Sequence, residues 1–118
     1  MKPFGWWWNK YLKCGAPPDA YEFGECEELF YIPRMGFMCW KVTQDKNLLV
    51  TKLCGNGLFW QDIAIGMCRA ANLRYVIFRT CRDTKALARR YGCEVFDYEK
   101  VGGRECWWMS KEACPSEG

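Results

Sequence analysis

Residues 47–73, NLLVTKLCGNGLFWQDIAIGMCRAANL, decide how the rest of the chain is interpreted. They begin with a short apolar run, residues 48–51, that is typical of a β-strand, and the chain then breaks at Gly55-Asn56-Gly57. From about residue 58 to residue 73, apolar residues recur at the helical period. A strand that gives way to a helix at glycines leaves backbone N–H groups unpaired beside the positive end of the helix dipole. The sequence therefore predicts a site for phosphate oxygens at this corner.

The composition indicates one folded domain spanning residues 1–118. Half of the residues are hydrophobic and 17% are aromatic, which excludes a disordered chain. The net charge of +3 permits anionic ligands but does not indicate nucleic acid as a partner. No apolar run approaches the length that crosses a membrane, so no membrane partner is expected.

The nine cysteines do not suggest a disulfide scaffold. Their number is odd, they are spread along the chain, and no Cys-x-x-Cys pair or secretory signal is present. The chain has no histidine and no close pair of ligands, so we expect no metal site. We therefore expect reduced, mostly buried thiols in a cytoplasmic protein.

Two strand patterns precede the opening stretch. Residues 29–32 form an apolar run that Pro33 ends, and residues 36–43 form a second run. Residues 44–47 form a turn, so both runs and residues 48–51 are expected to pair as an antiparallel meander. The helix pattern after Gly57 has one apolar face, consisting of Phe59, Trp60, Ile63, Ala64, Met67 and Ala71.

The second half of the chain completes the sheet. Residues 75–78 are an unbroken apolar run, and a strand there would be parallel to residues 48–51 through a right-handed crossover. Residues 83–91 predict a short helix, and residues 94–109 predict a hairpin around Gly102-Gly103. The expected fold class is α/β (α+β), with helices packed on a mixed, mostly antiparallel sheet.

The two ends of the chain are harder to interpret. Residues 1–28 are a poorly defined N-terminal segment, and residues 111–118 are expected to be a loose tail. Trp6, Trp7 and Trp8 lie on a short helix or an irregular segment. If they are exposed they form a surface for a protein partner, and if they are buried they cover the core.

The segment Lys52-Leu53-Cys54-Gly55-Asn56-Gly57 resembles the Q/R-x-x-G-x-G/A motif of the GNAT superfamily of acyl-CoA-dependent N-acyltransferases. That family carries the motif between its fourth strand and its third helix. The resemblance continues through the helix 58–72, the strand 75–80 and the closing hairpin, and it covers about residues 36–112. The glycine pattern alone is weak, but its place in the expected order of elements makes it more specific.

The resemblance implies that the chain binds acetyl-CoA. The backbone amides of residues 54–58 would hold its pyrophosphate, and Arg82, Lys85 or Arg89 would meet the remaining phosphate. The pantetheine arm would run between the strands 48–53 and 75–80, which diverge in this family. The implied cofactor-binding residues are Lys52, Leu53, Cys54, Gly55, Asn56, Gly57, Leu58 and Arg82.

The implied catalytic groups fit less well. In the family, the tyrosine that acts as the general acid lies four residues after the helix alanine. The corresponding position in this chain, four residues after Ala86, is Arg90. Tyr91 is one step further and would face about 100° away, so it serves as the general acid only if the helix is shortened. The chain has no histidine as a base and no acid on the strand 48–53. The remaining candidates for the base are Asp45, Glu28 and Glu25.

Only about 35 residues precede the second predicted strand, so the N-terminal half is abbreviated, as in small GNAT-like proteins of phages and mobile elements. Two functions follow from the resemblance. The first is an acyl-CoA-dependent N-acetyltransferase acting on an amine of a protein, a peptide or a small molecule. The second is a non-catalytic GNAT-like module that binds a protein, such as a phage-encoded inhibitor or accessory protein. Binding of single-stranded nucleic acid is disfavoured, because the basic residues do not alternate with aromatic residues along strands.

Overall fold

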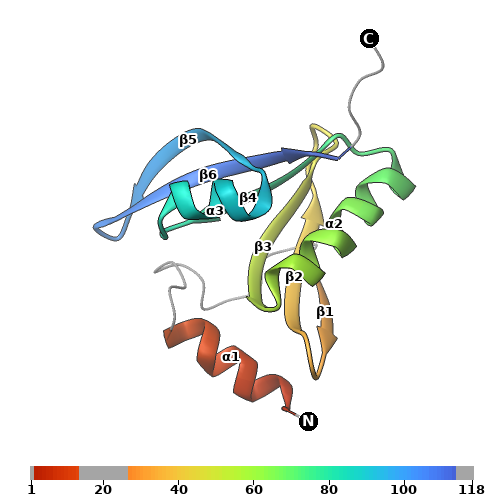
Figure 1. Cartoon of the computed structure of the whole chain (residues 1–118), viewed down its shortest axis with the longest axis vertical. Helices are drawn as coiled ribbons and strands as arrows, with labels where there is room; N and C mark the ends of the chain where they lie inside the picture. Colours follow the sequence, from red (N-terminus) through yellow and green to blue (C-terminus); the bar gives the residue numbers. More distant parts are fainter. Residues whose placement is uncertain (1, 14–26, 114–118) are drawn as a thin grey trace.

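The structure is a computed structural model, and it describes residues 2–13 and 27–113. The elements are α1 (Phe4–Lys13), β1 (Glu28–Ile32), β2 (Gly36–Val42), β3 (Leu48–Gly55), α2 (Gly57–Ala71), β4 (Tyr75–Thr80), α3 (Thr84–Tyr91), β5 (Glu94–Val101) and β6 (Arg104–Glu112) (Figure 1). The mixed, mostly antiparallel sheet with packed helices is as predicted. In the described part of the chain, no helix is both long and apolar enough to cross a membrane.

The strands form one six-stranded sheet in the order β1-β2-β3-β4-β6-β5. The predicted antiparallel meander of β1, β2 and β3 is confirmed. The parallel pair of β3 and β4 is also confirmed, but it extends only over Leu48↔Val76, Leu49↔Ile77 and Val50↔Phe78. The predicted hairpin closes the sheet, and its two turn glycines both have positive φ, as a type I′ turn requires: 54° for Gly102 and 84° for Gly103.

Helix α2 covers one face of the sheet. The Asn56 side chain caps its start by accepting from the Phe59 amide, and Asn72 ends it in the left-handed conformation with φ 59°. The buried residues of α2 are Trp60, Ala64 and Cys68, which are four apart and pack on a core of β2, β3 and β4 side chains. The prediction that Ala71 faces inward is wrong, because that residue is exposed and Cys68 holds the inward position.

Helix α1 covers the opposite face. Phe37 and Cys39 pack with α1, whereas Met38 between them belongs to the core under α2, and neighbouring residues of a strand point to opposite faces. Trp7 of α1 is 6% exposed, and its Nε1 donates to the Pro33 carbonyl at 3.1 Å. A short helix within the poorly defined segment 1–28 was one of the two sequence predictions, and it is confirmed for α1. The candidate Glu25 lies outside the described residues.

The prediction of a loose tail from residue 111 is wrong for its first three residues. Strand β6 continues to Glu112, where it pairs with Tyr75 of β4. Ala113 is 1% exposed, and its amide donates to the Arg74 carbonyl at 2.8 Å. The ladder with β4 and the packing of Ala113 outweigh the polar composition that suggested a tail. Residues 114–118 lie outside the described part of the chain.

Candidate functional site

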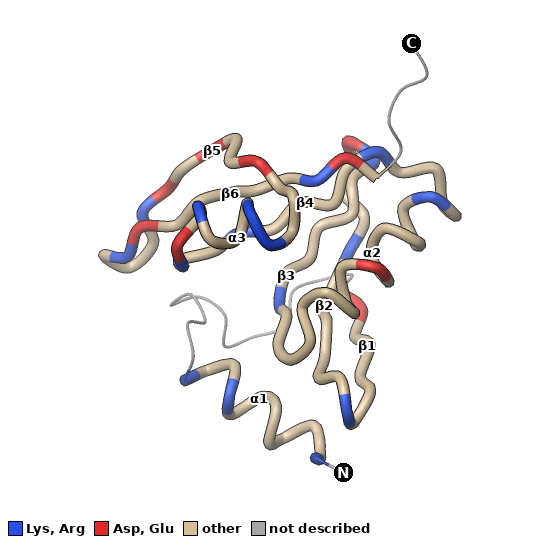
Figure 2. Tube along the Cα trace, in the orientation of Figure 1, with Lys and Arg blue, Asp and Glu red and all other residues tan. Residues whose placement is uncertain are grey.

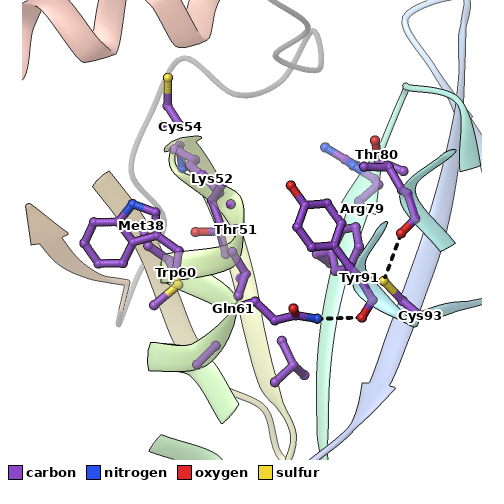
Figure 3. Close-up of a pocket in the computed structure, with 18 of the residues that line it drawn as sticks. Met38, Thr51, Lys52, Cys54, Trp60, Gln61, Arg79, Thr80, Tyr91 and Cys93 are labelled. Carbon is purple, nitrogen blue, oxygen red and sulfur yellow. Dashed lines mark hydrogen bonds between the residues drawn. The ribbon is translucent and has the colours of Figure 1, made fainter. Parts of the chain in front are cut away.

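A cavity opens where β3 and β4 diverge. Their parallel ladder ends at Val50 and Phe78, and beyond this point a space of about 320 Å³ lies between β3, β4, α2 and α3. Figure 3 shows side chains of α2 and β3 on one side of this space and those of β4 and α3 on the other. Its apolar walls include Val50, Leu53 and Val76. The cavity therefore lies between the two strands that the resemblance expected to diverge.

A β-bulge in β3 explains why the strands diverge. Cys39 of β2 is opposite Lys52 and Trp40 is opposite Val50, so no β2 residue lies opposite Thr51. A bulge bends its strand and increases the local twist. Past the bulge, β3 follows β2 as far as Gly55, whereas β4 stays beside β6. Thr51 lines the cavity at this point, and the sequence analysis did not single it out.

Fewer backbone amides are unpaired at the glycine corner than the sequence predicted. Gly55 still belongs to the ladder with β2, and with φ at +113° it lies against Gly36, where an added Cβ would meet the Met35 carbonyl oxygen at 2.0 Å. The Asn56 amide donates to that same Met35 oxygen at 2.9 Å. Gly57 and Leu58, the first residues of α2, have no carbonyl one turn earlier in the helix, and no other acceptor for their amides lies in residues 2–13 and 27–113. These two amides are therefore the ones that an anion can reach.

Cys54 points away from this corner. Its side chain is 8% exposed and packs against α1 with Trp7 and Phe37. In Figure 3 its sulfur lies on the α1 side of β3. Of the two interpretations of Cys54, a reactive thiol or a packed core residue, the structure supports the second.

Tyr91 closes the α3 side of the cavity. Helix α3 ends at this residue because Gly92 adopts the left-handed conformation at φ 67°. The Tyr91 carbonyl accepts from Gln61 Nε2 and from Lys111 Nζ, each at 2.7 Å, which fixes the end of α3 between α2 and β6. A Cβ added to Gly57 would lie only 2.2 Å from the Tyr91 hydroxyl. The phenol therefore lies over the first turn of α2, and only glycine leaves room for it there.

The cavity is lined by cations. Its charged lining residues are Lys10, Lys52, Arg79, Arg82 and Lys111, and no carboxylate lines it among the described residues. Figure 2 marks in blue the positions of Lys and Arg along the backbone of α1 and α3. Arg82, the predicted phosphate ligand, is in this set, whereas Lys85 and Arg89 are exposed residues of α3 outside the lining.

Glu27 is the acidic residue that the sequence analysis missed. Lys52 Nζ lies 2.7 Å from Glu27 Oε1 and 3.1 Å from Oε2, and the Thr51 hydroxyl donates to the same carboxylate. The side chains of Lys52 and Glu27 are 6% and 2% exposed. Burial, together with the Glu27 charge, raises the pKa of the nearby Cys39 thiol to about 12. The predicted bases Asp45 and Glu28 are exposed and do not line the cavity.

A sequence signal for this pair existed. Along β3 the buried residues alternate as Leu48, Val50, Lys52 and Cys54, so a lysine occupies a buried position of the strand. A buried lysine is almost always paired with a carboxylate. The partner could not be identified in advance, because it lies 25 residues away in the sequence.

Comparison with solved structures decides the fold. The chain is similar to a GNAT-family protein from Desulfovibrio desulfuricans (11% identity, TM-score 0.56, 66% of this chain and 60% of that chain). It is also similar to the IAA acetyltransferase from Bacillus cereus (10%, 0.58, 75% and 79%). A third similar structure is a GNAT family acetyltransferase from Elizabethkingia anophelis with acetyl-CoA bound (15%, 0.51, 86% and 76%). The chain has the GNAT fold. The chain spans 60% of the length of the Desulfovibrio protein. No protein-family model matches the chain, and no curated protein matches its sequence.

Proposed function

We propose that this chain is an acyl-CoA-dependent N-acetyltransferase that acylates an amine. The observation that carries the proposal is the slot between two parallel strands that ends at unpaired helix amides. The GNAT acetyltransferases with this fold include a structure with acetyl-CoA bound, which supports the same ligand here. When bound, acetyl-CoA supplies an acyl group activated as a thioester.

The residues present fit such a ligand. The amides of Gly57 and Leu58 and the positive end of α2 suit a diphosphate, and the Arg82 guanidinium adds a charge-assisted donor on the facing wall. Val50, Leu53 and Val76 supply an apolar passage for a slender chain. Lys52 is paired with Glu27, so its role is to hold the carboxylate and the bend of β3 and not to bind phosphate.

Two groups of Thr51, its main-chain N–H and its hydroxyl, are placed to take part in acyl transfer. The bulge removes Thr51 from the β2 ladder at the cavity wall, so we assign its main-chain N–H as a donor to a carbonyl oxygen in the slot. The Thr51 hydroxyl donates to Glu27, so a proton taken up at Oγ1 can be passed to the carboxylate as the hydroxyl proton leaves. We therefore assign Glu27 as the proton acceptor, working through Thr51.

Tyr91 is assigned to binding and not to acid catalysis. Its hydroxyl lies over Gly57, at the end of the cavity where the diphosphate would be held. A phenol O–H there is a donor for a phosphate oxygen. The predicted role as general acid requires the hydroxyl to lie deeper in the slot.

The test is calorimetric titration of coenzyme A into the full chain. We expect binding by the native protein and its loss in Gly57→Asp, because the new side chain displaces the Tyr91 hydroxyl and its carboxylate repels a diphosphate at the two amides. Gly66→Asp is the matched control, since Gly66 lies on the same helix with open space around it and should leave binding unchanged. Mass spectrometry of an amine panel with acetyl-CoA then tests for transfer. If the native, folded chain releases no heat with saturating coenzyme A, the proposal fails.

The alternative is a non-catalytic module that binds a protein. The predicted surface of Trp6, Trp7 and Trp8 does not support it, because Trp7 is buried and Trp8 is half-buried, which leaves Trp6 at 41% exposed. Exposed apolar residues on the edge strand β5 favour it instead, with Phe96 at 55% and Tyr98 at 49%. Coenzyme A binding without transfer to any amine would favour this alternative.

A further inference from the structure

Two thiols lie in contact next to the cavity. The Sγ atoms of Cys81 and Cys106 are 2.7 Å apart. Cys106, on β6, is fully buried, whereas Cys81, directly after β4, is partly exposed. Both are free cysteines. The pair takes no part in the proposed acyl transfer.

The sheet register explains this contact. The last residue pair between β4 and β6 is Thr80↔Trp107, and one further step in an antiparallel ladder brings Cys81 opposite Cys106. Opposite residues in such a ladder have Cα atoms about 4.5 or 5.5 Å apart, within the range of about 4.4–6.8 Å that a disulfide spans. The Sγ distance of 2.7 Å agrees with this placement, so the two thiols lie within reach of a disulfide.

The surroundings of Cys81 admit a small anionic reagent. A surface hollow there is lined by Cys81, Lys100, Gly103, Arg104, Glu105 and Trp107. It has two basic residues and one acidic residue, so carboxylates are favoured at its mouth. Glutathione disulfide, a small disulfide with four carboxylates, has this chemistry.

We propose that Cys81 and Cys106 form a cross-strand disulfide by exchange with a low-molecular-weight disulfide such as oxidised glutathione. The Cys81 thiolate attacks one sulfur of the reagent, which forms a mixed disulfide and releases one thiol. Cys106 then loses its proton and attacks the Cys81 sulfur, and the second thiol leaves. The protein loses two electrons and two protons, and the reagent gains them as two thiols.

The order of the two attacks follows from burial. Burial and the hydrogen bond with Cys81 raise the pKa of Cys106 to about 11, which keeps it a thiol and leaves the first attack to Cys81. The cross-link would act on the cavity, because Cys81 lies between two lining residues, Thr80 and Arg82. It would also attach the start of α3, which Asp83 caps, to β6 through Cys106.

The experiment exposes the full chain to oxidised or reduced glutathione, followed by alkylation, intact mass and peptide mapping. We expect a product about 2 Da lighter in which the peptides of Cys81 and Cys106 are linked, and its reversal by dithiothreitol. We also expect the melting temperature to rise by about 5–15 °C on oxidation. Cys81→Ser should abolish all three effects, whereas the control Cys68→Ala, at another buried thiol, should retain them.

Cys81→Ser is the main variant because Cys81 is partly exposed, so its loss leaves the core intact. Oxidation that gives only stable mixed disulfides, that links other cysteines, or that still gives the lighter product in Cys81→Ser would overturn the proposal. The readouts are mass and melting temperature, so none of them depends on whether the chain binds coenzyme A.

Discussion

The buried pair of Lys52 and Glu27 gives the sharpest prediction. In Lys52→Met, the Glu27 carboxylate keeps its burial, with 2% of its side chain exposed, but loses the cation that lies 2.7 and 3.1 Å from its two oxygens. Removing one partner of a buried pair costs about 3–5 kcal/mol, because the remaining buried charge loses its opposite charge. For a chain of this size we therefore expect the melting temperature to fall by about 10–20 °C.

A double-mutant cycle at pH 7 measures the interaction directly. Urea unfolding of Lys52→Met, Glu27→Gln and the double variant gives three free energies of unfolding. We expect the loss in free energy of unfolding of the double variant to be smaller than the sum of the two single losses by about 2 kcal/mol or more. The reason is that an apolar group opposite a neutral amide leaves no buried charge.

Arg74 and Glu112 provide the matched control. Their charged atoms are 3.8 Å apart, and the side chains are 54% and 39% exposed. Because such surface pairs contribute little, Arg74→Met should lose less than about 1 kcal/mol. If Lys52→Met also lost less than about 1 kcal/mol, or if the cycle were additive, the reasoning from burial would be refuted.

Three other outcomes are expected. Trp7→Ala should lose about 3–5 kcal/mol in urea unfolding, and Trp6→Ala less than about 1, because only Trp7 is buried; equal losses would contradict the packing of α1. The raised pKa of Cys39, about 12 against 9.0, means that its contribution to stability is fully present below about pH 9 and is lost as pH rises towards 12; unfolding curves from pH 8 to 10.5 should show a smaller decline in Cys39→Ala. Tyr91→Phe should weaken coenzyme A binding by about 3- to 10-fold with kcat retained, whereas a large fall in kcat alone would restore the role of general acid.

The sequence predicted what depends on local patterns. The strand–glycine–helix order placed β3 and α2, the crossover rule made β3 and β4 parallel, and Gly102-Gly103 located the last hairpin. The GNAT fold followed from this order of elements. The sequence did not decide between a helix and an irregular segment at α1. The residues Phe4, Trp7, Trp8 and Tyr11 have helical spacing, but three consecutive tryptophans also suit an irregular segment.

The site required information that local patterns do not contain. The pairing of Lys52 with Glu27 depends on how β1 lies relative to β3, and the bulge at Thr51 depends on the register of β2. Successive positions of a helix point about 100° apart, so Tyr91 at the end of α3 does not take the direction of position 90, and where its hydroxyl lies depends on how α3 packs against α2. The contact of Cys81 with Cys106 follows from a ladder between segments 25 residues apart.

The short ladder between β3 and β4 has a mechanical consequence. It joins two three-stranded halves of the sheet, β1-β2-β3 and β4-β6-β5, through three residue pairs and the crossover helix α2. Few backbone hydrogen bonds therefore resist a rotation of one half against the other, and hydrogen exchange at residues 48–50 and 76–78 should report that motion. A ligand in the slot would contact both halves at once, so its binding would stabilise the short contact between β3 and β4.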